Sequence, residues 1–557
     1  MRRSLVLVLT LIITMPALAE TDNISSEWIA KWRQDLTFLE EKLPESHADL
    51  WHTVSRDSLA AMFRDLRRDL PNLAQHEIIV RLGEIIASIG DGHTRLSWPL
   101  AEGIEFLQGH SSTPQPSSSD LVFHQFPIRI GVYDDGIFVE RIEKQHAKIL
   151  GTRVTKIDSV PIEEVIRRVD PVIHRDNEYQ ILELLPETLV LGEILHARGV
   201  ISNRSRARWT IEKPDGTVET VLLETVPAKA EADWVHVFET MPGKPLSHRY
   251  LADGFSPRRG LFSKRYWFEW LPEQHAVYLQ YNEVYDDDEE SILEFSRRLR
   301  RFIEESPVEK LIVDLRYNMG GDNSQGKPLL HAIIASDKIR RPGGLFVITG
   351  RGTFSAAMMF AVDVEKHVAP VFVGEPTGAL PNSYGDSRKI LLPNSGLTVR
   401  ASTLYWQYGG PRDDRAYIRP HVPASPRWDD LMAGRDAALD AILQSPTRSA
   451  LAGTWEGSLS ADGRTIPVTV EIDGGTGGSI RSSDWGWFTP DTVFRIRIDS
   501  KTEPIRFDAV EENGFTFHFT GRFVGPRLLG HVTWQEQRGD PLVFVLEPLD
   551  KPEDGEP

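Results

Sequence analysis

Apolar side chains recur at helical spacing through the first part of the chain. Residues 25–89 carry them every three to four positions, first around Trp32 and again around Leu82. This pattern predicts a small helical domain, which we assign to residues 20–100. The turn Gly90-Asp91-Gly92 breaks the last helix and is followed by His93, so the sequence places this histidine on a rigid loop before a short strand.

The pattern changes to short alternating runs between residues 126 and 226. The preceding stretch, residues 103–125, is rich in Ser, Pro and His and is typical of an exposed loop. Residues 136–139 and 151–158 predict strands, and Pro214-Asp215-Gly216 predicts the turn of a final hairpin. Strands around one or two helices suit a module that binds a peptide along an exposed sheet edge. The composition fits a purely architectural insert equally well.

Residues 263–445 alternate apolar strands with helices. Strands are predicted at residues 276–281, 310–316 and 344–349, with an amphipathic helix over 291–303. The alternation predicts an α/β core with a largely parallel sheet, in which active sites collect at the carboxyl ends of the strands.

A final unit over residues 453–549 consists of short alternating strands separated by glycine turns. This pattern predicts an antiparallel β-barrel or sandwich. Nothing in this unit indicates catalysis.

One serine stands at a strand-to-helix junction of the core. Ser355 follows the strand 344–349 and the turn at Gly350, and a helix is predicted to begin at Ala356. The amide of Ala356 then lies at a helix N-terminus, where partial positive charge favours an oxyanion. Gly320 and Gly321, in the sharp turn after strand 310–316, can supply a second amide. The alternative is that Ser355 serves only as a helix N-cap.

Charge and cysteine content narrow the function classes. With 63 Lys and Arg against 81 Asp and Glu, the net charge of −18 argues against a nucleic-acid partner. The absence of cysteine excludes disulfides, a thiol nucleophile and a lipoprotein anchor. We expect neither a cofactor nor a metal ion.

The first nineteen residues have the composition of a signal peptide. Arg2 and Arg3 precede an apolar run over residues 5–13, and Ala17-Leu18-Ala19 is a small-x-small cleavage site. We therefore expect residues 1–19 to be removed and the protein to be exported, periplasmic or secreted. An uncleaved anchor is the alternative, but the run is short for a span, and no later segment has 18 consecutive apolar residues. The sequence leaves a homo-oligomer open.

Four motifs occur in the order found in the tail-specific (C-terminal-processing) serine peptidases, which the chain resembles over residues 25–445. They are Asp91-Gly92-His93-Thr94, residues 312–321, Gly352-Thr353-Phe354-Ser355-Ala356-Ala357 and residues 373–378. The resemblance implies a helical N-terminal domain, a PDZ-like module at 126–226 and a crotonase-like (ClpP-like) α/β catalytic core at 263–445. The C-terminal β domain lies outside it.

The family divides on how the serine is activated. One branch uses a lysine in the region that corresponds here to residues 378–384, which contains none; Lys366 and Lys389 lie elsewhere. The tricorn-like branch uses a histidine from the Asp-x-His motif, here His93, and a later acid. Asp413 and Asp414 lie 58 and 59 residues after Ser355, where that branch carries its acid. The Asp-Arg dipeptide favours Asp414, although two aspartates beside arginines also suit a solvated loop.

The resemblance and the residues together predict a serine endopeptidase or carboxyl-terminal-processing peptidase acting on peptides or unfolded proteins. Ser355 would form the acyl-enzyme, His93 would be the general base, and Ala356 with Gly320 or Gly321 would hold the oxyanion. A histidine base of ordinary pKa predicts an acid limb of kcat/KM near pH 6.5. The alternative is an inactive family member that binds apolar ligands or peptides.

Overall fold

The structure, a computed structural model, describes most of the chain from residue 25 to residue 549. The predicted signal peptide and Glu20 lie outside the described residues, as does most of the stretch 103–125. Within the described part, no helix is long and apolar enough to cross a membrane. The described ranges are 25–100, 121–226, 234–240, 244–249, 251–256, 260–340, 343–368, 370–443, 453–461, 464–472, 477–484, 492–500, 505–512, 514–524, 527–534 and 541–549.

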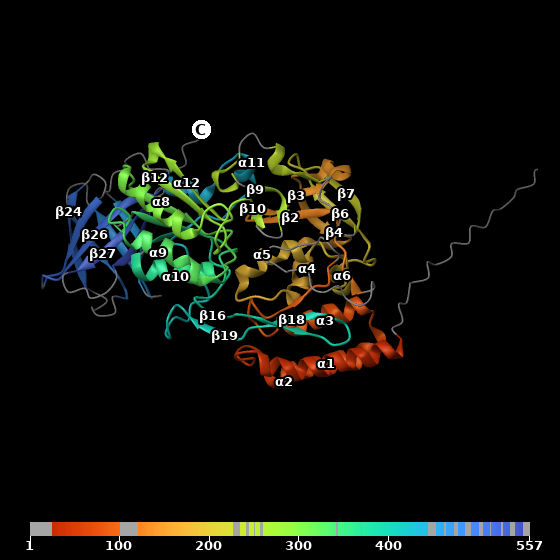
Figure 1. The fold of residues 1–557 in the computed structure, drawn as a ribbon. Helices are drawn as coiled ribbons and strands as arrows, with labels where there is room; N and C mark the ends of the chain where they lie inside the picture. Colours follow the sequence, from red (N-terminus) through yellow and green to blue (C-terminus); the bar gives the residue numbers. More distant parts are fainter. Residues whose placement is uncertain are drawn as a thin grey trace, which may run out of the picture.

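Three helices form the N-terminal region: α1 (Ser26–Ser46), α2 (Arg56–Asp69) and α3 (Gln75–Ala87). The hydroxyls of Ser25 and Ser55 cap the first two by accepting backbone amides. The apolar positions that predicted these helices are buried, from Trp32 in α1 to Leu82 in α3. After α3 the chain turns at Gly90, with a φ of +83°, and enters β1 (Arg95–Ser97). Figure 1 shows α1 and α2 along the lower side of the molecule.

A second region surrounds one antiparallel sheet in the order β2-β3-β4-β6-β7, which leaves β2 at an edge. Helix α5 packs beside β2, and residues of both elements line a cavity. The elements are β2 (Ile128–Tyr133), β3 (Gly136–Glu143), β4 (Arg153–Ile157), β5 (Val160–Pro161), α4 (Ile162–Val169), α5 (Glu178–Thr188), α6 (Gly192–Ala197), β6 (Arg206–Glu212), β7 (Val218–Glu224) and β8 (Trp234–His236).

The core is a six-stranded sheet in the order β11-β12-β13-β14-β15-β20, parallel from β12 onward. Both faces are buried, which explains the continuous apolar runs of its strands. Val313 and Val347 face α8, α9 and α10, whereas Ile312 and Phe346 face α12. The elements are β11 (Tyr266–Leu271), β12 (Ala276–Tyr281), α8 (Ile292–Glu305), β13 (Lys310–Asp314), α9 (Lys327–Ile334), β14 (Leu345–Thr349), α10 (Ala356–Val368), β15 (Val371–Gly374), β20 (Val422–Pro423), α11 (Trp428–Met432) and α12 (Ala437–Leu443).

An excursion between β15 and β20 reaches from the core to the N-terminal helices, as Figure 1 shows. It contains β16 (Asn382–Gly385), β17 (Arg388–Leu391), β18 (Thr398–Ala401) and β19 (Leu404–Gln407). β16 pairs with β19, while β17 and β18 form a sheet with β1. At its far end the buried carboxylate of Asp35 accepts the backbone amides of Asn394 and Ser395, at 2.9 and 2.8 Å. The sequence pattern did not predict this excursion.

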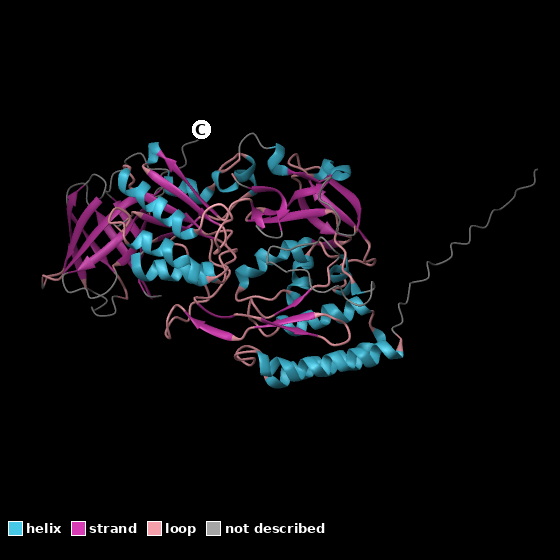
Figure 2. Ribbon diagram, in the orientation of Figure 1, coloured by secondary structure: helices cyan, strands magenta, loops and turns pink. Residues whose placement is uncertain are grey.

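The C-terminal unit is a closed eight-stranded antiparallel barrel, which decides between the predicted barrel and sandwich. Leu529 and Val545 on its outside pack with Leu439 and Ile442 of α12, so the barrel covers one face of the core sheet. Figure 2 shows it as the strand-rich end of the molecule. Its strands are β21 (Gly453–Ala461), β22 (Arg464–Ile472), β23 (Gly477–Arg481), β24 (Val493–Ser500), β25 (Ile505–Val510), β26 (Thr516–Val524), β27 (Arg527–Trp534) and β28 (Leu542–Pro548).

The segment between the second region and the core contains α7 (Val237–Thr240), β9 (Leu251–Ser256) and β10 (Gly260–Phe262).

Candidate active site

Ser355 occupies the turn between β14 and α10 with a left-handed backbone. Its φ of +54° is rare for a residue with a side chain and marks local strain, which collects at functional sites. The turn is held from below, because the buried hydroxyl of Thr353 donates to the carbonyl of Leu315 at 2.9 Å. The amide of Phe354 donates to the carbonyl of Asn318 at 3.1 Å. The strand end at β13 therefore fixes the serine turn.

His93 lies directly against this serine. Its Nε2 is 3.0 Å from Ser355 Oγ, and its ring stacks on Phe354 with centroids 4.5 Å apart. Gly92 allows this approach, because a Cβ at that position would come within 2.7 Å of both Phe354 and Gln180. The structure thus joins two residues that lie 262 positions apart in the sequence.

Asp91 organises the backbone that carries His93. Its buried carboxylate accepts the amides of His93 and Thr94, at 2.9 and 2.7 Å, and the hydroxyl of Ser402 at 2.7 Å. Its other oxygen pairs with Nε2 of the buried His47 at 2.8 Å. Burial alone would raise the pKa of Asp91, but these hydrogen bonds hold it well below its usual range. Asp91 is therefore ionised. It joins the loop that precedes β1 to Ser402, which lies in the segment between β15 and β20.

The His93 ring is neutral at ordinary pH. Burial, together with the nearby charge of Arg95, lowers its pKa to about 4. A neutral imidazole can accept a proton from Ser355 through Nε2. Within the described part of the chain, the other ring nitrogen, Nδ1, is buried and makes no hydrogen bond.

Asp413 and Asp414 lie in the loop between β19 and β20. The carboxylate of Asp413 is half-buried and binds Arg415, with Nη2 to Oδ2 at 2.7 Å, and Arg415 also binds Glu365. Asp414 is exposed. Since Nδ1 of His93 has no partner among the described residues, neither aspartate reaches it in this structure.

The two lysines that could serve a serine–lysine scheme point elsewhere. Lys366, near the end of α10, donates to the carbonyl of Tyr408. Lys389 is an exposed residue of β17. The hydrogen-bond partner of Ser355 Oγ is instead Nε2 of His93.

The predicted oxyanion residues converge beside Ser355. Ala356 is the first residue of α10 and lines the cleft with Gly321. The amide of Gly320 is used internally, donating to the Asn318 side chain at 2.9 Å. The amide of Val284 donates to the carbonyl of Gly320, and the carbonyl of Val284 accepts the amide of Asp322. The Gly321 amide therefore points away from Val284. Of the two glycines, Gly321 is therefore the better placed donor.

These groups open onto a cleft of about 530 Å³. It is bounded by the serine turn, the loop after Gly321 and the excursion hairpin, which contributes Tyr384, Asp386 and Trp406. An extended peptide can lie in such a cleft. The lining residues are His93, Tyr285, Gly321, Asp322, Asn323, Ser355, Ala356, Met359, Ser383, Tyr384, Gly385, Asp386, Ser387 and Trp406.

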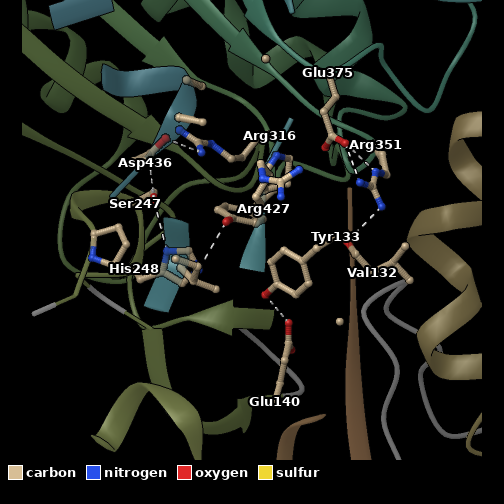
Figure 3. Close-up of a pocket in the computed structure, with 18 of the residues that line it drawn as sticks. Val132, Tyr133, Glu140, Ser247, His248, Arg316, Arg351, Glu375, Arg427 and Asp436 are labelled. Carbon is tan, nitrogen blue, oxygen red and sulfur yellow. Dashed lines mark hydrogen bonds and ion pairs between the residues drawn. The ribbon is translucent and has the colours of Figure 1, made fainter. Parts of the chain in front are cut away.

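A second cavity, of about 280 Å³, lies between the β2 edge and the core and contains neither Ser355 nor His93. Figure 3 shows Arg351 at its wall, bound to Glu375 at 2.6 Å. The same guanidinium donates to the carbonyl of Val132 in β2 at 3.1 Å. Arg351 thereby links the edge strand of the second region to the turn that carries Ser355.

Burial disfavours the charged form of three carboxylates around this cavity. Burial raises the pKa of Glu183, on α5, to about 7, and it also raises the pKa values of Glu140 and Glu375. Tyr133 donates to Glu140 at 2.7 Å, as Figure 3 shows. The junction between β2, α5 and the core is therefore sensitive to pH.

One group of side chains in the described residues could hold a metal ion: His76, Glu77 and His196. In this structure His76 Nε2 and His196 Nδ1 lie 2.9 Å apart, at hydrogen-bond distance. None of the three lines the cleft that contains Ser355.

Sequence reasoning missed several residues that build the site. Asp91 stands inside a motif that was used only for its histidine, and its pairing with His47 and Ser402 joins segments with no sequence signal in common. Arg351 precedes the serine turn. Its ion pair with Glu375, 24 residues later, could not be predicted from the spacing of the two residues.

No protein-family model and no curated protein matches the chain. Among solved structures, mature CPAF is similar over 75% of this chain and 97% of its own, with a TM-score of 0.51 and 15% identity. Mature CPAF complexed with lactacystin is similar over 73% and 96%, with a TM-score of 0.50 and 15% identity. The tricorn protease covers 74% of this chain at 13% identity and a TM-score of 0.32.

The likeness to CPAF extends over nearly the whole of that structure and concerns the fold. The resemblance to tail-specific serine peptidases, first seen in four short motifs, is confirmed at the level of the fold. The helical N-terminal region, the α/β core and the barrel agree with the predicted fold class.

Proposed function

We propose that this chain is a serine peptidase that hydrolyses peptide bonds of peptide or unfolded protein substrates, with Ser355 as nucleophile and His93 as general base. The observation that carries the proposal is the 3.0 Å contact between Ser355 Oγ and His93 Nε2 at the wall of an open cleft. A fold shared with CPAF supports it.

The reaction follows from the protonation state of the two groups. Neutral His93 takes the Ser355 proton as Oγ attacks the scissile carbonyl, and the imidazolium then protonates the leaving amine. The acyl-enzyme that remains is hydrolysed when His93 deprotonates a water molecule, which restores the serine. The ionised Asp91 below the loop favours the transient positive charge on His93.

The oxyanion formed in each step would be stabilised by the amides of Ala356 and Gly321. Ala356 contributes the positive end of the α10 dipole as well as its N–H group. Removing one such donor costs roughly 3 kcal/mol of transition-state stabilisation in comparable sites. Gly320 supports the arrangement, because a Cβ there would come within 2.7 Å of the Ser355 Cβ.

The acid that orients His93 is part of the proposal. Asp414 is the preferred candidate, because Asp413 is already paired with Arg415. Asp414 would have to approach Nδ1 when substrate orders the loop between β19 and β20. Comparing kcat/KM of Asp413→Asn and Asp414→Asn with the wild type tests this role, and equal, small effects of both would remove it.

Export and peptide docking complete the proposal. A signal peptide over residues 1–19 would direct the enzyme to the periplasm or the exterior. The region from 126 to 226 would act as a PDZ-like module in which a peptide adds to the open edge of β2 beside α5. Substitutions that disrupt pairing of a peptide with the β2 edge should then raise KM for long peptide substrates more than for short ester substrates.

The experiment that tests the activity uses purified protein with denatured casein and sequences the new termini. We expect cleavage that is abolished in Ser355→Ala, and covalent labelling of Ser355 by a fluorophosphonate. Lactacystin, present in a CPAF complex, serves as a second probe of the same hydroxyl. If wild type and Ser355→Ala show the same background with both readouts, the protein is not a peptidase.

A further inference from the structure

The cleft around Ser355 is acidic. Apart from His93, the charged side chains that line it among the described residues are Asp322 and Asp386, and neither lysine nor arginine is present there. Neither aspartate forms an ion pair with a described residue; Asp322 accepts hydrogen bonds from Ser324 and Gln325, which leave its negative charge unneutralised. A cleft of this kind attracts a cationic side chain and repels a carboxylate.

Asp386 is held in place by its surroundings. It has a φ of +53°, a strained conformation that aspartate tolerates better than most residues. Its Oδ2 accepts the indole N–H of Trp406 at 2.6 Å, and its carbonyl accepts the hydroxyl of Thr403 at 2.7 Å. These contacts fix the exposed carboxylate and leave Oδ1 without a described donor.

The position of Asp386 relates it to the reacting bond. The preceding residue, Gly385, lies beside the His93 ring, since a Cβ there would be 3.9 Å from His93 Cε1 and 3.3 Å from Trp406. Because His93 must reach the leaving amine, Asp386 borders the part of the cleft that holds the residues next to the scissile bond.

Asp322 lies beyond Gly321, on the side of the cleft where the oxyanion would form. Hydrogen bonds from the backbone and hydroxyl of Ser324 lower its pKa, so it is charged at neutral pH. Tyr285 and Trp406 line the same cleft, and aromatic rings suit the aliphatic stem and charged end of a lysine or arginine.

We propose that Asp386, assisted by Asp322, makes the enzyme select substrates that carry lysine or arginine next to the scissile bond. This inference rests on the proposed peptidase function and adds the substrate class. It also predicts that peptides with acidic residues at that position are cleaved poorly.

The test uses pairs of quenched fluorescent peptides that differ only in arginine against its neutral isostere citrulline, placed on either side of the scissile bond. We expect the wild type to prefer arginine by roughly tenfold in kcat/KM at low salt, with the ratio falling as ionic strength rises. Asp386→Asn, which keeps the size and backbone preference of the residue, should bring the ratio close to one. Asp484→Asn, an exposed residue of the barrel region, removes the same charge and should leave the ratio unchanged.

The ratio of kcat/KM for the arginine peptide to that for the citrulline peptide distinguishes a change in specificity from a general loss of activity. A change at His93 affects both peptides of a pair equally. The salt titration of the wild type needs no variant, and Asp386→Lys should reverse the preference toward glutamate over glutamine. Equal cleavage of arginine and citrulline peptides by the wild type would overturn the specificity and leave the peptidase proposal intact. Cleavage of neither peptide beyond Ser355→Ala would overturn both.

Discussion

At the scale of single residues, the burial of His93 changes the pH range in which the site can work. A histidine of ordinary pKa loses its function as a base below about pH 6.5. The His93 ring is stacked on Phe354 and faces the charge of Arg95, so its protonated form is disfavoured. The sequence alone predicted the ordinary value, because neither contact can be read from spacing.

We expect the acid limb of kcat/KM to lie well below pH 6.5, toward the His93 pKa of about 4. A lowered pKa keeps the base neutral at lower pH, so activity extends further into the acid range. Initial rates with a short ester or peptide at low substrate concentration, from about pH 3 to 8, measure the limb. A limb at or above pH 6.5 would show that the free enzyme does not hold His93 in this environment.

The same series includes the variants that identify the base. His93→Ala and Ser355→Ala should each lower kcat/KM by several orders of magnitude, and the double variant should be little worse than either, because the two act as a unit. Lys366→Ala and Lys389→Ala are the matched controls and should retain activity. Activity that survives in His93→Ala but not in a lysine variant would favour the serine–lysine scheme.

Ser355 and His93 could be predicted from sequence because each lies in a short motif beside glycines. A Cβ at Gly92 would come within 2.7 Å of Phe354, and one at Gly352 within 2.7 Å of the Arg316 carbonyl oxygen. The partners of these residues could not be predicted. Asp414 was preferred to Asp413 on a dipeptide alone, and the ion pair of Asp413 with Arg415 could not be predicted. The role of Asp91 could not be predicted for a similar reason, since two of its partners, His47 and Ser402, come from distant segments.

At the scale of elements, Arg351 connects two parts of the fold. It lies four residues before Ser355, is buried, and binds both Glu375 after β15 and the Val132 carbonyl at the edge of β2. That carbonyl belongs to the edge where an added peptide strand would pair. Movement of β2 on peptide docking would therefore act directly on the serine turn.

Substituting Arg351 should separate stability from activity. Arg351→Met leaves Glu375 buried without its cation, and we expect a loss of roughly 3 kcal/mol in stability together with lower kcat/KM. Adding Glu375→Leu removes the unpaired acid and should restore most of the melting temperature but not the activity, because the bond to Val132 is still absent. Melting curves and casein cleavage for the two variants measure both. Activity that recovers in parallel with the melting temperature would show that the link to β2 has no functional role.

Long elements could be predicted and short ones could not. The amphipathic period of residues 291–303 matches α8, and the apolar runs of the core match β13 and β14. The excursion was missed because its four strands are only four residues long and alternate with turns, which leaves no periodic signal. Yet this excursion supplies Asp386 and Trp406 to the cleft.

At the scale of the whole molecule, the parts are joined by contacts that the sequence could not show. The barrel packs through Leu529 and Val545 on α12, and the excursion ties the core to α1 through Asp35. The predicted division of the chain rested on composition and periodicity, which differ from region to region. How the regions pack against one another depends on contacts between side chains of different regions. A single sequence carries no signal for such contacts.

Glu183 makes the stability of the junction between the β2 region and the core depend on pH. Glu183 on α5 faces the serine turn, since a Cβ at Gly352 would lie 3.3 Å from its Oε1. Burial raises its pKa to about 7, and the nearby Glu375 and Glu140 add to the effect. The folded state therefore holds a proton that the unfolded chain releases near pH 4.5. The contribution to stability is fully present below that value and is lost as the pH rises through about 7.

We accordingly expect the melting temperature of Glu183→Gln to rise relative to that of the wild type as the pH increases from 5 to 8. One proton bound more tightly in the folded state corresponds to at most about 1.4 kcal/mol per pH unit, which sets the size of the difference between the two slopes. Glu178→Gln, on the exposed face of the same helix, is the matched control and should follow the wild type. If the slopes of wild type and Glu183→Gln coincide, Glu183 is ionised in the folded protein and the junction does not sense pH through this residue.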